Sequence, residues 1–245
     1  MKRLVFLICS ACLLAATAHA SSKVELDDPN IDLTDQAALQ NGAKYFVNYC
    51  FGCHSLQYQR YESLVDDLGI TEKQLEANFL FGSKTPTDQM TNSMPAGNAE
   101  NWFGAPPPDL SVIARSRGPD WLYTFLRSFY LDESRPLGVN NLVFEKVGMP
   151  HQLWELQGWQ KLVETTTTDD AGHEHTSHEL ELVEAGEMTP AEYDQAVREL
   201  VTFLTYVGEP VKLERQRLGI FVLLFLAVFA VIAYILKKEF WRDVH

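Results

Sequence analysis

Two cysteines and a histidine form the clearest group of residues in this sequence whose types and spacing define a chemistry. Cys50, Cys53 and His54 stand in the run C-F-G-C-H. Two thiols at this spacing can add to the vinyl groups of a haem, and the imidazole that follows then lies under the iron as its proximal ligand. The motif therefore predicts one covalently bound haem c.

Two other chemistries compete for the same residues. A redox-active dithiol is expected in the strand-to-helix turn of a βαβ unit, and a zinc site needs two further ligands at a suitable spacing. Neither context is clear in this sequence, which favours the haem.

A methionine thioether is the expected second axial ligand, because it closes the iron to other ligands and suits electron transfer. Met149 stands in the run V-G-M-P (147–150), where the glycine allows close backbone approach to the haem and the proline stiffens the loop. Met94 is also followed by a proline, so the spacing alone makes Met149 the preferred ligand without excluding the others. The candidates outside the first 20 residues are Met90, Met94, Met149 and Met188.

Both ends of the chain carry targeting signals. Residues 1–20 begin with a basic pair, continue with an apolar run and end in A-H-A, which is typical of a secretory signal peptide; a short N-terminal membrane anchor is the alternative. Residues 218–236 contain no charge and, as a helix, match the thickness of a bilayer. We therefore expect a signal peptide (1–20), an exported haem domain (21–217), a transmembrane helix (218–236) and a cytoplasmic tail (237–245).

The acidity of the chain belongs to the predicted exported domain. The formal charge of the whole sequence is −13, whereas residues 21–217 hold 31 acidic and 15 basic side chains, a net charge of −16. This sign argues against nucleic acid as a partner, because binding to phosphates needs a surplus of Lys and Arg. It favours a basic partner, which electrostatic steering would bring in faster.

The exported domain is expected to be mainly α-helical. Apolar residues at helical spacing predict one helix over 36–49, leading into Cys50, and another over 120–130. Capping residues predict a short helix after Thr71 and a longer one after Thr189, ending near residue 207.

Two stretches depart from this helical pattern. Residues 82–119 are rich in Gly, Pro and Asn and are expected to be mainly ordered loop. Alternating polar and apolar residues around 161–184 predict a β-hairpin with a long polar tip over 165–178. The tip contains His173, His175 and His178, a candidate transition-metal site, although we expect a solvated loop there.

Several short runs, in order through residues 31–245, resemble the cytochrome c1 family, whose members are haem subunits of ubiquinol–cytochrome c reductase (cytochrome bc1) complexes. Segment 82–101 and the long hairpin tip have no clear counterpart in that pattern. The runs that carry the resemblance are C-F-G-C-H-S-L-Q-Y (50–58), P-P-D-L-S (107–111), G-M-P (148–150), V-T-F-L (201–204), E-P (209–210) and R-Q-R-L-G (215–219).

The resemblance implies a role for each candidate site residue. Cys50 and Cys53 would be the thioether sites, and His54 and Met149 the two axial ligands of the iron. Arg117 matches an arginine that family members place against a haem propionate, where a guanidinium offsets the buried carboxylate.

Two more positions follow from the same resemblance. Pro108 and Trp121 fall where the family lines the haem crevice, although an aromatic residue at helical spacing is equally typical of an ordinary core.

The same resemblance implies the fold, the function and the partners. The fold would be mainly α: a cytochrome c-like haem domain with long ordered loops, a small β-hairpin and one C-terminal transmembrane helix. The chain would relay single electrons from the Rieske iron–sulfur protein to a basic cytochrome c, beside cytochrome b and membrane lipid in a dimeric complex. The haem domain would lie in the periplasm, on the inner membrane. The alternatives are the mono-haem subunit of a terminal oxidase and a haem sensor with an exchangeable sixth ligand.

Overall fold

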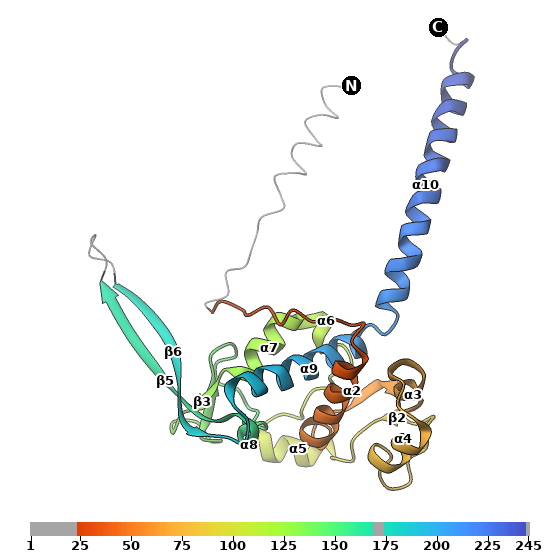
Figure 1. Ribbon diagram of the computed structural model, residues 1–245. Coiled ribbons are helices and arrows are strands. Elements are labelled where there is room, and N and C mark those ends of the chain that lie inside the picture. Colours follow the sequence, from red (N-terminus) through yellow and green to blue (C-terminus); the bar gives the residue numbers. More distant parts are fainter. Residues whose placement is uncertain (1–23, 169–173, 244–245) are drawn as a thin grey trace.

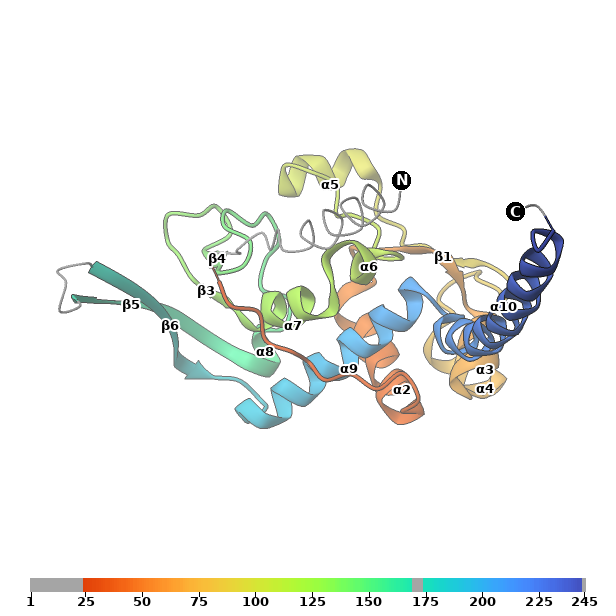
Figure 2. The same cartoon turned by 90° about the horizontal axis from the view of Figure 1, so that it is seen from above.

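A long hairpin and a long helix project from a body of short helices and loops in the computed structural model, which describes residues 24–168 and 174–243 (Figure 1). The hairpin pairs strands β5 (Gly158–Thr168) and β6 (Glu174–Ala185), and the projecting helix is α10 (Lys212–Phe240). Seen from above, the two leave opposite ends of the body (Figure 2). The predicted signal peptide, residues 1–20, lies outside the described residues.

Helix α2 (Gln36–Tyr45) carries the chain to the C-x-x-C-H motif, as the sequence predicts. Its first turn is capped by Asp35, whose side chain accepts a hydrogen bond from the backbone N–H of Ala38 (3.1 Å). The helix continues into one wider π-helical turn, η1 (Phe46–Cys50). Cys50 therefore ends a continuous helical segment and is held by it.

Helix α9 (Pro190–Gly208) crosses α2, and this pair forms the centre of the body. Thr189 and Glu192 form the predicted reciprocal capping box at its start. At the crossing, a Cβ built on Gly42 would lie 2.1 Å from the carbonyl oxygen of Glu199. The two backbones therefore approach to a distance that leaves no room for a side chain at residue 42.

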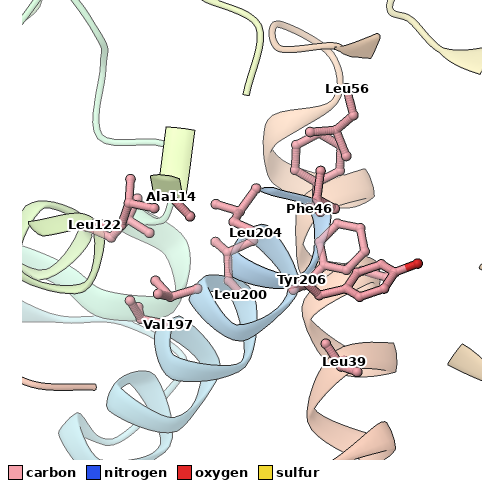
Figure 3. Close-up of a cluster of buried hydrophobic side chains, with 14 of the residues drawn as sticks. Leu39, Phe46, Leu56, Ala114, Leu122, Val197, Leu200, Leu204 and Tyr206 are labelled. Carbon is pink, nitrogen blue, oxygen red and sulfur yellow. The ribbon is translucent and has the colours of Figure 1, made fainter. Parts of the chain in front are cut away.

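The core continues outward from this crossing (Figure 3). The ring of Phe46 packs on that of Phe203, with 5.8 Å between centroids, and both side chains are fully buried. Figure 3 also shows Leu200 and Leu204 on the face of α9 that is turned toward Ala114 and Leu122. The central helices are thus joined by apolar packing both to each other and to the next part of the chain.

Short elements follow the C-x-x-C-H motif. Strand β1 (Leu56–Arg60) pairs antiparallel with β2 (Gln89–Met90), and between them lie α3 (Glu62–Leu68) and α4 (Glu72–Asn78). A capping box between Thr71 and Gln74 opens α4, which confirms the predicted helix after Thr71.

The segment 82–119 is mainly loop, as the sequence predicts, but two short helices interrupt it. Helices α5 (Ala96–Phe103) and α6 (Ile113–Arg117) lie within it. Pro95 stands immediately before α5, and Gly104 ends it in the left-handed conformation (φ +81°). Pro95 and Gly104 are therefore helix boundaries, which proline and glycine form as well as loops.

Helix α7 (Pro119–Arg127) confirms most of the helix predicted over 120–130. It ends three residues early, because Phe129 enters strand β3 (Phe129–Leu131), which pairs with β4 (Val139–Asn141). Aromatic side chains suit both helix and strand cores, so their spacing alone did not mark this boundary.

The predicted β-hairpin is confirmed, but the prediction that residues 165–178 form a long loop at its tip is wrong, because the strands continue into them. Pairing starts at Gly158 and Ala185, beside the short helix α8 (Trp154–Gln157), and continues through Thr165–Ser177 to Thr168–Glu174. The β-branched threonines favour this extended backbone. Among the described residues, no group of three or more His, Cys, Asp or Glu could hold a metal ion, and His173 lies outside them.

Helix α10 contains the whole of the predicted span, residues 218–236, and extends beyond it at both ends. Its length and composition suffice to cross a membrane, and its mean hydropathy reaches 3.0 over 18 residues. None of its side chains is buried. The ribbon of α10 stands away from the body of the molecule in Figure 1. An apolar helix of this kind needs lipid or another protein around it.

Candidate functional site: a haem cavity

One cavity of about 380 Å³ brings together all the residues that the family resemblance assigns to the haem site. Its wall is mainly apolar and is drawn from the C-x-x-C-H motif, the loop before α6, helices α6, α7 and α9, and the loop around Met149. The predicted residues in this wall are Cys50, Cys53, His54, Pro108, Arg117, Trp121 and Met149.

The two cysteines enter the cavity from the turn that ends η1. The backbone N–H groups of Cys53 and His54 both donate to the carbonyl of Cys50, at 3.0 and 2.9 Å. Both thiols are free, and burial raises the pKa of the Cys50 thiol to about 12. A redox dithiol needs a lowered pKa, so this environment does not favour redox exchange at Cys50.

The imidazole of His54 is nearly buried, and its Nδ1 lies 2.7 Å from the carbonyl oxygen of Pro108. A carbonyl oxygen can only accept, so Nδ1 carries the proton and Nε2 keeps a free lone pair. Burial also lowers the pKa of His54, which favours the neutral ring. The chain thus presents a neutral, oriented imidazole, which is the form that binds a metal.

Met149 is the methionine that the structure places in the cavity wall. Among the other described methionines, Met90 is fully buried in the core, and neither Met94 nor Met188 lines the cavity. Beside Met149, a Cβ built on Gly148 would lie 3.5 Å from the carbonyl oxygen of Phe103. The loop therefore passes close to the end of α5, at a distance where a Cβ on residue 148 would make an ordinary van der Waals contact.

Arg117 and Trp121 form one side of the cavity together. The guanidinium lies 5.1 Å from the centre of the Trp121 ring and 5.9 Å from that of Phe144, both within cation–π range. Trp121 in turn stacks on Phe125 at 4.8 Å. Arg117 is the one charged side chain among the described residues that line the cavity.

These residues fit a haem c. Two free thiols, a neutral imidazole and a thioether are the donors that covalent attachment and six-coordination require. An apolar wall suits the porphyrin faces, and a single cation suits a propionate. The volume lies in the range of ordinary cofactor pockets.

Several lining residues were not identified from the sequence. Leu200 and Leu204 stand four residues apart on α9, which is the spacing of any core-facing pair. Phe103 and Phe144 come from segments without a periodic pattern, so the sequence held no signal for them.

A C-x-x-C-H motif whose cysteines and histidine line an apolar cavity is typical of a c-type cytochrome. The profile of the Cytochrome C1 family matches residues 28–244, nearly all of the sequence. The chain therefore belongs to the cytochrome c1 family.

Individual relatives agree with this membership. The chain is 52% identical to cytochrome c1 of Allochromatium vinosum and 44% identical to a protein of Nitrosomonas europaea named ammonia monooxygenase gamma subunit, each over 100% of both chains. It is 29% identical to cytochrome c1 of Rhodospirillum rubrum, over 86% of this chain and 83% of the relative.

Family membership gives the function and the cofactor. The chain is a membrane-anchored electron-transfer subunit of the cytochrome bc1 complex and binds one covalent haem c. Family membership and the observed elements also confirm the predicted fold class, which is mainly α with a small β-hairpin and one C-terminal apolar helix. The terminal oxidase subunit and the haem sensor are not favoured.

Proposed function

We propose that this chain receives single electrons from the Rieske protein and passes them to a basic cytochrome c, with His54 and Met149 as the axial ligands. The observation that carries the proposal is that one cavity wall holds both of these side chains together with the two cysteines. When bound there, the haem supplies one-electron ferric–ferrous chemistry.

In this proposal the protein residues attach the haem, orient its axial ligands and shield it from water. Cys50 and Cys53 form the two thioethers, and the carbonyl of Pro108 keeps the lone pair of His54 on Nε2. Arg117 offsets a propionate charge. The apolar side chains exclude water, and the thioether of Met149 closes the iron to small ligands.

The ligand assignment is tested by comparing Met149→Leu with Met94→Leu in the full chain. We expect Met149→Leu to lower the midpoint potential sharply and to let carbon monoxide bind to the reduced protein, because the iron loses its soft sixth ligand. Met94→Leu is the matched control, since Met94 lies outside the cavity wall. If carbon monoxide bound to reduced Met94→Leu but not to reduced Met149→Leu, Met94 would be the ligand and the assignment would be reversed.

We also propose the topology. Residues 1–20 are removed as a signal peptide, 21–217 lie in the periplasm, 218–236 cross the inner membrane and 237–245 end in the cytoplasm. An uncharged span within α10 and the C-x-x-C-H motif, which needs export for attachment, support this orientation. Protease added to intact spheroplasts should remove the haem domain; complete protection would reverse the topology.

The partners proposed for the complex are cytochrome b, the Rieske protein and a second copy of the same assembly. The relative from Nitrosomonas europaea supports a second candidate, a monooxygenase complex, because that protein is named as a monooxygenase subunit. Purification of the membrane complex through a tag on this chain separates the two. Recovery of cytochrome b and the Rieske protein supports the first candidate, and recovery of monooxygenase subunits without them supports the second.

A further inference from the structure

We propose that His151 is a positioning residue, whose ring holds the Met149 loop in the place where the thioether reaches the iron. This inference rests on the proposed role of Met149. His151 follows Met149 by two residues, and its side chain is only 5% exposed.

The ring of His151 is held between two strands. One face stacks on Phe129 of β3, with 5.0 Å between centroids and 6° between planes. Trp159 of β5 meets it edge-on, at 5.8 Å and 79°. A loop that has no regular secondary structure of its own is therefore fixed to two separate β-hairpins through one side chain.

The same contacts lead back to the cavity wall. Phe129 meets Phe125 at 5.1 Å, and Phe125 lines the cavity and stacks on Trp121 at 4.8 Å. The rings thus form an unbroken series from the Trp121 side of the cavity to His151. This series sets the position of the Met149 loop relative to the opposite wall.

The strand that carries Trp159 is itself rigidly placed. A Cβ on Gly158, which has φ +90°, would lie 2.0 Å from the carbonyl oxygen of Glu184, and one on Gly186 would lie 2.4 Å from that of Leu156. The base of the β5–β6 hairpin is therefore a tight crossing of two backbones. Trp159 gives the loop a fixed support for this reason.

His151 is not itself a second histidine ligand. It does not belong to the described cavity wall, and its Nε2 is buried without a hydrogen-bond partner. The ring also hydrogen-bonds to the backbone of Gly158, which joins the Met149 loop to the first residue of β5. Phenylalanine would keep the ring contacts and lose this hydrogen bond, whereas alanine would lose both.

The test uses the full-length chain with its haem and measures carbon monoxide binding to the reduced protein. We expect His151→Ala to raise the apparent affinity about tenfold or more, because the loop is then free to release the thioether. The absorption band of thioether-ligated ferric haem should weaken in parallel. His151→Phe keeps the ring contacts with Phe129 and Trp159 and should lie closer to the native protein than to His151→Ala in both measurements.

Two further variants separate positioning from general destabilisation. Leu75→Ala removes a buried side chain of α4 that does not line the cavity, so it should lower the melting temperature but leave the iron closed. Trp159→Leu removes the edge contact with His151, together with the stacking of Trp159 on Trp154, and should let carbon monoxide reach the iron in part of the protein. It replaces His151→Ala if that protein does not accumulate.

The outcomes distinguish this inference from the proposed function. If Met149→Leu opens the iron but His151→Ala and Trp159→Leu both leave it closed, the positioning role is wrong and the ligand assignment stands. A His151→Phe protein as open as His151→Ala would also overturn the ring-packing argument. If Met149→Leu itself stays closed, the proposed ligand is wrong.

Discussion

The environment of single residues determines the chemistry that each can perform in the cavity. His54 is neutral and oriented because it is buried and donates to Pro108 (2.7 Å). Such an outer partner fixes the ring and strengthens the remaining nitrogen as a ligand. Arg117 is exposed and rests on the Trp121 ring, so it brings a charge to the edge of the cavity without full desolvation.

Arg117→Gln should lower the midpoint potential of the haem. A nearby positive charge favours the ferrous state, whose net charge is lower, and a partly exposed ion pair of this kind is worth roughly 1 kcal/mol or less. We therefore expect a fall of about 20–40 mV, since a tenfold change for one electron is about 59 mV. Redox titration measures it.

Arg115→Gln is the matched control for that change. Arg115 stands on the same helix, α6, but does not belong to the cavity wall. An equal fall in both variants would show that the effect is one of overall charge and that Arg117 has no special place beside the haem.

Residues in a local motif were predictable, whereas residues defined by tertiary neighbours were not. The spacing of Cys50, Cys53 and His54 is enough to predict haem attachment, and all three line the cavity. His151 carries no such signal, because its partners Phe129 and Trp159 are 22 and 8 residues away along the chain. Only the fold brings those rings together.

At the scale of elements, the α2–α9 crossing positions the motif. Helix α2 runs through η1 into Cys50, and α9 contributes two lining residues, so a shift between these helices would change the shape of the cavity. Gly42 permits their close approach, since its Cα faces the backbone of Glu199 and the side chain of Phe203. The crossing is therefore where a small change should have a large effect.

Gly42→Ala should destabilise the folded protein. The added Cβ would lie 2.1 Å from the carbonyl oxygen of Glu199, so the helices must separate, at a cost of about 1–3 kcal/mol. For a chain of this size, each kcal/mol lowers the melting temperature by about 2–4 °C. Thermal unfolding followed by circular dichroism checks the fall.

Gly97→Ala provides the comparison within a helix. A Cβ at Gly97 of α5 meets nothing within 4 Å, so this variant should be neutral or slightly stabilising. If both variants had the same melting temperature as the native protein, the close helix crossing would not be important for stability.

Helices with strong caps and regular apolar spacing were predictable, and short elements were not. The cap candidate Thr71 and the capping-box spacing at Thr189 predicted the starts of α4 and α9. In contrast, α5 has eight residues and α6 has five, too few to establish a period against a background of glycine and proline. The strand pairing of the hairpin tip depends on a partner strand, which local sequence does not report.

At the scale of the whole molecule, the chain consists of an acidic domain followed by one apolar helix. Helix α10 is exposed along its length, whereas residues 21–217 carry a net charge of −16. Long-range attraction of a basic carrier needs no single acidic residue, because the fields of many charges add at distances beyond contact. The charge of the domain should therefore act on the rate of encounter.

Electron transfer to a basic cytochrome c should consequently slow as salt is added. Raising the ionic strength from about 0.01 to about 0.15 M shortens the Debye length from about 30 to about 8 Å, and we expect the second-order rate to fall about tenfold or more. Stopped-flow oxidation of the reduced complex measures this rate. An uncharged small oxidant is the control, since it feels no steering. A rate that stays constant with the basic carrier would mean that the acidic surface takes no part in docking, whatever its size.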